Sequence, residues 1–333
     1  MAFLTTYHVA VKGIASCVPK NKSLNSDLTI FSDSEKEKLI ATLGIETRRI
    51  ASENTCASDM CLVAAEKLIA DLNWRKEDID LLVFVSQTPD YILPGTSTQL
   101  VYKLGLSENC ISYDLNQGCA GYVYGLSVAS NMMSSSKLKK GLLLIGDTIT
   151  KLISQDDKST VPLFSDAGTA TALEYDENAK PMFFNIKTMG RNYDSIIVRD
   201  GAAKNNFNSK TAIIKMKGME VFQFSISKVN PVIDELFNFS EIKHNDIESY
   251  IFHQANQLIV DMLISKQKID PAKAPKSLKE FGNTNGASIP LTASLYLKNG
   301  NGKILLCGFG VGLSVATCIL EINDLVCSDL SEI

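Results

Sequence analysis

Patterns of apolar residues typical of helices and of strands alternate along the chain. Residues 57–72 carry apolar side chains at helical spacing, and residues 81–85 after them form a short continuous apolar run typical of a buried strand. The alternation continues with expected helices at 98–104 and 120–133 and expected strands at 110–114, 142–146 and 168–174. Such an alternation predicts an α/β fold with largely buried sheets.

The second half of the chain repeats this plan. Residues 78–84 are echoed by residues 246–252, and residues 141–146 by residues 303–308. Apolar strands of any α/β protein resemble one another, so either echo alone is ambiguous, but the two echoes have nearly the same offset. A duplicated α/β unit explains both. We therefore expect one compact fold with similar halves, 1–178 and 179–333.

No low-complexity linker separates these halves. Residues 199–209, with one glycine and three asparagines, are the most turn-rich segment and predict a surface loop. Residues 291–297 predict an amphipathic helix, and residues 313–322 alternate and are rich in β-branched side chains, which predicts a further strand.

Charge and composition exclude several classes of protein. The 33 basic and 37 acidic side chains give a net charge of −4, whereas a nucleic-acid binder needs a surplus of cations. A chain that is 45% apolar and 21% charged is typical of a soluble globular protein. Because no run reaches the roughly 18 apolar residues of a membrane span and the first residues lack a signal-peptide pattern, we expect a cytoplasmic protein without membrane contact.

The cysteines do not indicate a metal site. None of the eight forms a CxxC pair, so we expect buried thiols and no bound metal. The chain has only three histidines. His8 falls in an expected strand and His244 in a charged loop, which leaves His253 as the imidazole to consider for catalysis.

Cys119 stands where an expected strand ends and an expected helix begins, in the run DLNQGCAG. Unpaired N–H groups and the positive end of the helix dipole at such a position favour a thiolate. The alternative is a buried cysteine at a packed junction between strand and helix. Local sequence leaves both readings open.

Two further polar segments are candidates. His253 comes directly after an apolar run that predicts a strand, and it is the first residue of HQAN. Ligands of α/β folds bind at such strand ends. Asn283 lies in GNTNGAS, where it is either a fixed amide donor or part of a capping loop. For His253, the alternative to a catalytic role is a structural histidine held by hydrogen bonds.

The run GFGVG at residues 308–312 follows an expected strand. It lacks the GxGxxG spacing of a dinucleotide-binding loop and is followed by a strand, not a helix. The glycines more plausibly let a backbone N–H approach a substrate oxygen, as an oxyanion hole requires.

Together these segments resemble the β-ketoacyl-acyl-carrier-protein synthase III family of the thiolase superfamily. The resemblance rests on Cys119 in NQGCAGYVYGLSVA, His253 in FHQAN, Asn283 in GNTNGAS and the terminal GFGVG, in that order. It extends over essentially the whole chain, including Gly44-Ile45 with Arg48 and residues 164–168. It implies a five-layered αβαβα thiolase-like fold with two pseudo-symmetric halves, an obligate homodimer, and a Cys-His-Asn triad where the halves meet.

The resemblance also implies a reaction. Cys119 takes an acyl group from a thioester, and His253 and Asn283 then bind the carbonyl of a malonyl-type thioester while it loses carbon dioxide and attacks the acyl-enzyme. The backbone N–H groups of Cys119 and Val311 form the expected oxyanion hole. No cofactor is expected, because CoA or phosphopantetheine arrives as the substrate thioester, from acyl-CoA or an acyl carrier protein. Expected substrate contacts are Leu93, Asn256, Phe309 and Gly310.

The donor-binding positions depart from the family pattern. Lys38 and Thr42 stand where the family has a CoA-handling Trp and a neighbouring Arg, and Leu258 and Lys158 replace two further arginines. Lysine does not reproduce the planar stacking and bidentate phosphate contact of arginine. We therefore expect a specialised acyl or polyketide pathway in place of acetyl-CoA priming of fatty-acid synthesis.

One more position bears on the acyl group, and two other functions remain open. The resemblance implies that Leu93 stands where a family side chain reaches across the dimer to cap the partner's acyl pocket, and Leu in place of a bulkier aromatic residue predicts room for a longer or branched acyl chain. One alternative is an acyltransferase in which His253 deprotonates a hydroxyl or amine acceptor and no C–C bond forms. The other is a non-catalytic binding partner that retains the fold.

Overall fold

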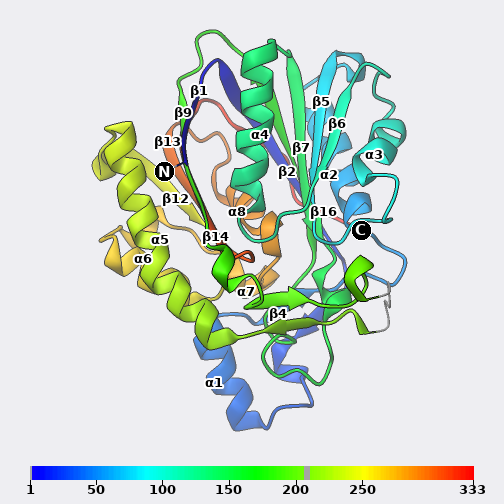
Figure 1. Cartoon of the computed structure of the whole chain (residues 1–333), viewed down its shortest axis with the longest axis vertical. Helices are drawn as coiled ribbons and strands as arrows, with labels where there is room; N and C mark the ends of the chain where they lie inside the picture. The colour runs from blue at the N-terminus through cyan, green and yellow to red at the C-terminus, as the bar shows by residue number, and fades with distance from the viewer. Residues whose placement is uncertain (1, 206–210) are drawn as a thin grey trace.

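The chain folds into five layers in the order helix, sheet, helix, sheet, helix (Figure 1). This computed structural model describes residues 2–205 and 211–333. The five-layered α/β architecture expected from the sequence is confirmed.

The first sheet has the strand order β15-β2-β8-β7-β5-β6, with β16 also pairing with β2. Its strands are β15 (Val326–Cys327), β2 (Val9–Val18), β8 (Ala167–Tyr175), β7 (Lys140–Asp147), β5 (Ile79–Val85), β6 (Ile111–Leu115) and β16 (Ser331–Glu332). The second sheet has the order β1-β9-β14-β13-β12. Its strands are β1 (Ala2–Thr6), β9 (Met182–Thr188), β14 (Ser314–Ile322), β13 (Gly302–Gly310) and β12 (Ile247–Phe252).

The two sheets share one pairing pattern. In the first, β5 runs parallel to β7, which is antiparallel to β8, which is antiparallel to β2. In the second, β12 runs parallel to β13, which is antiparallel to β14, which is antiparallel to β9. The echoed segments of the sequence are thus β5 with β12 and β7 with β13, at equivalent places in the two sheets.

The boundary between residues 178 and 179 stays a prediction, and the terminal strands cross it. Strand β1, from the N-terminus, pairs with β9 in the second sheet, whereas β15 and β16, from the C-terminus, pair with β2 in the first. Each half therefore completes the other half's sheet.

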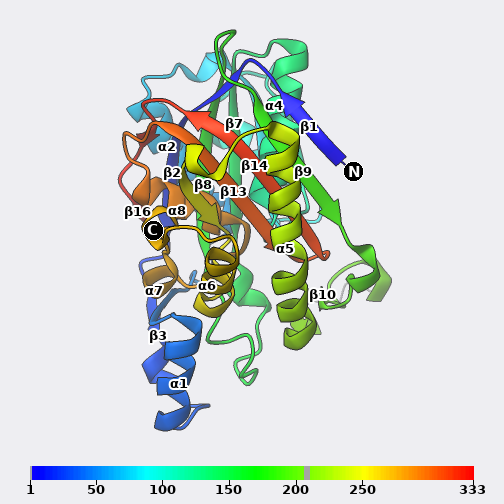
Figure 2. The same cartoon turned by 90° about the vertical axis from the view of Figure 1, so that its left-hand side faces the viewer.

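Six helices form the outer and central layers of this arrangement. Helices α2 (Ala57–Asp71) and α3 (Thr96–Leu104) cover the first sheet (Figure 1). Helices α5 (Gly218–Ser240) and α6 (Gln257–Lys266) cover the second (Figure 2). Helices α4 (Gly121–Ser136) and α8 (Ser288–Tyr296) lie between the sheets. The remaining elements are α1 (Asp33–Leu43), α7 (Leu278–Phe281) and the two-stranded pairs β3 (Lys22–Leu24) with β4 (Thr47–Arg49) and β10 (Ile196–Val198) with β11 (Ile214–Met216).

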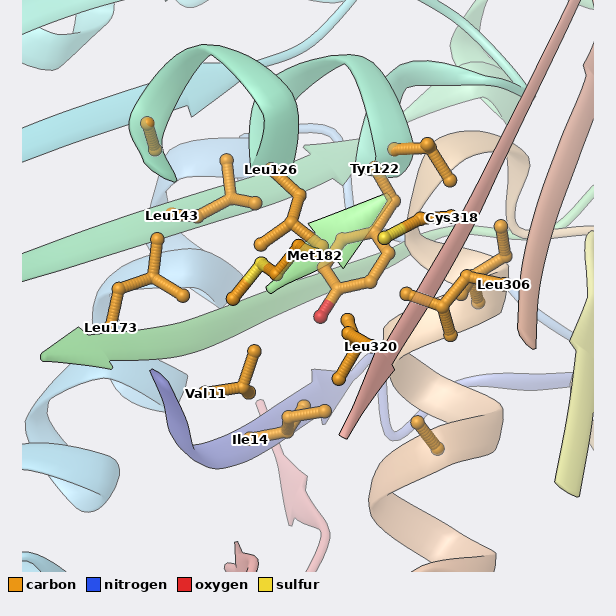
Figure 3. Packing of buried hydrophobic residues seen from close by; sticks show 14 of the residues in the cluster. Val11, Ile14, Tyr122, Leu126, Leu143, Leu173, Met182, Leu306, Cys318 and Leu320 are labelled. Carbon is orange, nitrogen blue, oxygen red and sulfur yellow. The ribbon is translucent and has the colours of Figure 1, made fainter. Parts of the chain in front are cut away.

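The core explains why the strands read as continuous apolar runs. In β5, Leu81 and Val83 face the central helices, while Leu82 and Phe84 face α2 and α3, so both faces are buried. The central core between the sheets gathers side chains from both halves, as Figure 3 shows for Tyr122 and Leu126 of α4, Leu143 of β7 and Leu306 of β13.

Most expected elements agree with the structure to within about two residues. Helix α3 begins two residues earlier than expected, because the N–H groups of Thr96 and Ser97 donate to the Asp114 carboxylate at 2.6 and 2.7 Å. Because the capping carboxylate comes from strand β6, the sequence of the helix itself does not indicate this cap. In the expected loop at 199–209, residues 203–205 form a 3-10 turn and residues 206–209 lie outside the described part of the chain.

Candidate active site

Cys119 lies between the end of β6 and the start of α4, with 5% of its surface exposed. Gly310, at the end of β13, packs directly on it: a Cβ at this glycine would lie 2.7 Å from both the Cβ and the Sγ of Cys119. The missing side chain lets the next residue bring its backbone to the sulfur. The N–H groups of Val311 and of Cys119 itself lie close enough to the sulfur to lower its pKa.

The pKa of Cys119 corrects one expectation from the sequence. Burial raises the pKa of this thiol to about 11, and the nearby Asp147 carboxylate raises it further. The N–H groups of Val311 and Cys119 lower this pKa, but burial outweighs them. The helix itself begins at Gly121, so Cys119 is two residues before it. In the free protein Cys119 is therefore a thiol at neutral pH.

His253 follows β12 directly and is almost fully buried. Its backbone N–H donates to the Cys307 carbonyl at 2.8 Å, which continues the pairing of β12 with β13. Its Nδ1 lies 2.7 Å from Ser288 Oγ, and the Phe309 ring meets the imidazole edge-on with centroids 5.4 Å apart. Burial lowers the pKa of His253 to about 3, so the ring is neutral at physiological pH.

Asn283 is held on both sides by backbone bonds. Its N–H donates to the Leu163 carbonyl at 3.0 Å, and its own carbonyl accepts from the N–H of Ser165 at 2.9 Å. Its side-chain Oδ1 accepts from the N–H of Asn285 at 2.9 Å, and its Nδ2 donates to the Ala255 carbonyl at 3.3 Å. The segment around Ser165, which is part of the family resemblance at residues 164–168, thus holds the Asn283 amide in the site.

Cys119, His253 and Asn283 line one cavity of about 160 Å³. They come from three separate segments that follow β6, β12 and α7. The other expected site residues on the same cavity wall are Asn256, Phe309, Gly310 and Val311. Seven of the eight residues singled out from the sequence are therefore brought together.

Leu93 lies elsewhere. Its side chain is 79% exposed, and within the described residues it lines neither this cavity nor the neighbouring one. Its neighbour Ile92 lines that second cavity, which has a volume of about 560 Å³. Phe164, Ile196 and Val311 line both cavities, so the two spaces adjoin beside Cys119.

The residues that depart from the family pattern lie at the surface. Thr42 and Leu258 line a surface groove of about 690 Å³ between α1, α5 and α6. Lys158 pairs with Glu35 at 3.1 Å, and Lys38 is exposed on α1.

Three contacting residues were not recognised from the sequence. Ser288 touches His253, and Asn285 accepts the Cys119 Sγ–H through Oδ1 at 3.1 Å. Asn285 also donates through Nδ2 to Asp147 Oδ2 at 2.7 Å. Asn285 and Ser288 fall in or beside the GNTNGAS run, and Asp147 ends an apolar strand. Their places in a polar run and at a strand end could have marked them as candidates in the sequence. Only the fold shows which side chains they contact.

The structure offers no cluster of metal ligands and no membrane span in the part of the chain that it describes. Among those residues, no three His, Cys, Asp or Glu side chains gather as a metal site. None of the described helices is long and apolar enough to cross a membrane.

Two family models and two curated relatives of this chain point to the same family. Residues 113–190 match the family described as 3-oxoacyl-[acyl-carrier-protein (ACP)] synthase III, and residues 237–322 match its C-terminal part. A putative 3-oxoacyl-[acyl-carrier-protein] synthase 3 of Campylobacter jejuni is 31% identical, over 95% of this chain and 94% of the relative. A beta-ketoacyl-[acyl-carrier-protein] synthase III of Rickettsia bellii is 33% identical, over 93% and 98%.

A solved structure extends the similarity to three dimensions. The crystal structure of a 3-oxoacyl-(acyl-carrier protein) synthase from Burkholderia xenovorans LB400 superposes with a TM-score of 0.96 at 33% identity. The superposition covers 100% of this chain and 99% of that one. The thiolase-like α/β fold expected from the sequence is confirmed.

Proposed function

The chain belongs to the 3-oxoacyl-[acyl-carrier-protein] synthase III family and is a condensing acyltransferase, and we propose that Cys119, His253 and Asn283 carry out its chemistry. The observation that supports this assignment is their convergence on one cavity. A nucleophile and two hydrogen-bonding groups facing one enclosed space are what two-step acyl transfer requires.

In the first step, the Cys119 sulfur attacks the carbonyl carbon of an acyl thioester. A new C–S bond forms, the bond to the donor sulfur breaks, and the donor leaves as a thiol that carries the proton lost by Cys119. Negative charge develops on the carbonyl oxygen during the attack. The N–H groups of Cys119 and Val311, which act on the sulfur in the free protein, supply the oxyanion hole.

In the second step, His253 and Asn283 stabilise the charge that appears when a malonyl-type thioester loses carbon dioxide. The N–H groups of the two side chains donate to the thioester oxygen, and the carbanion attacks the acyl group on Cys119. A C–C bond forms, the C–S bond to Cys119 breaks, and the Cys119 thiolate that leaves takes up a proton from water.

The state of His253 supports this role over that of a general base. We assign Ser288 Oγ, which accepts from the Gln254 N–H at 3.3 Å, as the donor to His253 Nδ1, and the ring proton to Nε2. A ring whose pKa is lowered to about 3 is a weak base toward a hydroxyl or amine, but it donates a hydrogen bond without changing its charge. This favours condensation over O- or N-acyl transfer.

The assignment has a direct test. Incubation with acyl thioesters should produce an acyl adduct on Cys119, detectable by mass spectrometry and absent in Cys119→Ala. His253→Ala and Asn283→Ala should still form the adduct but should lose the release of carbon dioxide from a malonyl thioester. Adduct formation without any release of carbon dioxide by the unaltered protein would favour acyl transfer to another acceptor.

We also propose a specialised acyl donor. The 560 Å³ cavity beside Cys119 is in the size range of sites that hold whole small molecules, far more than an acetyl group needs. Thr42 and Leu258 are uncharged in the groove at the surface, where Lys266 is the cation among the described lining residues and Asp261 carries the opposite charge. Lys158 is already paired with Glu35. The donor's CoA or phosphopantetheine serves as the substrate's thiol carrier, with no separate cofactor.

We further propose a homodimer that forms through the exposed edge of the first sheet. Strand β6 is the last strand in that sheet, with an unpaired edge that can extend onto a second copy. The nearby loop exposes the apolar side chains of Tyr91, Ile92 and Leu93. Such a dimer would bury this loop and bring Leu93 toward the partner.

A further inference from the structure

Asn285 contacts each of the three proposed catalytic residues. Its side-chain Oδ1 accepts the Cys119 Sγ–H at 3.1 Å, and its backbone N–H donates to Asn283 Oδ1 at 2.9 Å. Its backbone carbonyl lies close enough to the His253 ring to act on the pKa of the imidazole, in the direction opposite to burial. The residue has a left-handed backbone, with φ of 53°, a conformation that asparagine tolerates better than most side chains.

Asp147 determines which end of the Asn285 amide faces the sulfur. This carboxylate is fully buried at the end of β7. Its Oδ1 accepts from the N–H of Gln87 at 2.7 Å and from Ser86 Oγ at 3.1 Å, and its Oδ2 accepts from Asn285 Nδ2 at 2.7 Å. A buried carboxylate needs donors around it.

The orientation of this amide has a chemical consequence. If the Asn285 amide were reversed, its carbonyl oxygen would lie against the carboxylate of Asp147, and the two would repel. The carboxylate therefore holds Nδ2 toward itself and Oδ1 toward Cys119. An acceptor at that place stabilises the S–H form of the sulfur and disfavours the thiolate.

We propose that Asn285 and Asp147 form a positioning pair that holds the proton on Cys119 until an acyl thioester enters the site. Asn285 binds the proton, and Asp147 orients Asn285. The pair keeps the free enzyme from reacting with unrelated electrophiles, while the N–H groups of Cys119 and Val311 stay available for the substrate oxygen. The inference rests on the proposed function only in taking Cys119 as the nucleophile.

The surroundings of the sulfur make the pair testable through the acidity of the thiol. The titratable side chains closest to Cys119 in the described structure are Asp147, from β7, and His253, from the end of β12. The first turn of α4 carries no acidic side chain. Because His253 is neutral, Asp147 is the charge that must be separated from the effect of Asn285.

The experiment measures the rate of iodoacetamide alkylation at Cys119 against pH, with the labelled peptide identified by mass spectrometry. Asn285→Gly suits the left-handed backbone and keeps both backbone contacts while removing the amide. It should lower the midpoint of the pH profile by about 0.4 to 1 pH unit, the effect expected for loss of one hydrogen bond to the thiol. The midpoint of the pH profile reports the acidity of the Cys119 thiol. A change in the access of iodoacetamide to the sulfur alters the rate but not this midpoint.

Asp147→Asn separates orientation from charge. It should lower the midpoint in the unaltered protein, because the amide of Asn285 can then turn its Nδ2 toward the sulfur. In the Asn285→Gly background the same change should lose at least half of its effect. An equal effect in both backgrounds would show that Asp147 acts through its charge alone and would overturn its orienting role.

The test also covers a variant that does not fold and a failure of the proposed condensation. If Asn285→Gly does not fold, as judged by circular dichroism, Asn285→Ser is the second variant, since its side chain ends one atom nearer the backbone. An unchanged or raised midpoint in a folded variant would overturn the proposal. Because alkylation needs no acyl donor, a failure of the proposed condensation would show separately, as absence of adduct and carbon dioxide release with a normal alkylation profile.

Discussion

The imidazole Nδ1 of His253 lies 2.7 Å from the hydroxyl oxygen of Ser288, although 35 residues separate them along the chain. Ser288 is the first residue of α8, the central helix of the second half. The contact orients a neutral ring whose other nitrogen, Nε2, is the one that we propose as the donor to a substrate. The helix that joins the two sheets in the core therefore also positions a proposed catalytic side chain.

The first prediction concerns this contact. Ser288→Ala should lower the rate of decarboxylation of a malonyl thioester by about tenfold, the effect of one lost hydrogen bond on a transition state. Acylation of Cys119, which does not use the imidazole as a donor, should change much less. Equal losses in both half-reactions, measured separately, would argue that Ser288 acts only on the fold.

The second prediction concerns Gly310. Gly310→Ala would place a methyl group 2.7 Å from the Cys119 sulfur and on a backbone with φ of 147°, so the strand or the sulfur must move. We expect acylation of Cys119 to fall by roughly a hundredfold, as small displacements of reacting groups can cause. Gly190→Ala is the matched control, because a Cβ there meets no atom within 4 Å. Normal acylation by the Gly310 variant would contradict this account.

The third prediction concerns pH and stability. Since the pKa of folded His253 is lowered to about 3, the unfolded chain binds the proton more readily. The neutral ring contributes stability above the unfolded pKa of about 6.5, and this is lost as pH falls toward 3, by up to about 1.4 kcal/mol per pH unit.

His253→Gln removes this contribution, so its urea midpoint should fall less than that of the unaltered protein between pH 6.5 and 4.5. Comparing the two proteins also cancels the opposite effect of Asp147 and Asp166, whose pKa values are each raised to about 6. Parallel pH profiles for the two proteins would show that His253 stays accessible to protons in the folded state.

The fourth prediction concerns Leu93. In the proposed dimer this exposed side chain reaches the partner's acyl cavity, so Leu93→Phe should reduce activity with long or branched acyl donors, by about tenfold for each methylene excluded. Leu93→Ala is the control and should keep or widen the range. An unchanged chain-length preference in both variants, measured with a series of acyl thioesters, would remove Leu93 from the acyl site.

Much of the fold could be predicted from local patterns, and particular elements show why. Strand β5 is buried on both faces, so it reads as a continuous apolar run, and β12 echoes it at an equivalent place in the second sheet. Helix α3 shows the limit, because its first turn is capped by Asp114 from β6. A boundary set by a distant carboxylate leaves no mark on the helix's own sequence.

The sequence by itself predicted the order of the elements and the duplication of the α/β unit, because apolar periodicity is a local property, and its family resemblance pointed to Cys119, His253 and Asn283. Tertiary structure alone decided the chemical state of those groups. Burial raises the pKa of Cys119 and lowers that of His253, and desolvation depends on the whole surrounding fold. The amide of Asn285 meets a thiol and a carboxylate that lie 166 and 138 residues away along the chain, and its orientation exists only once the two halves have packed together.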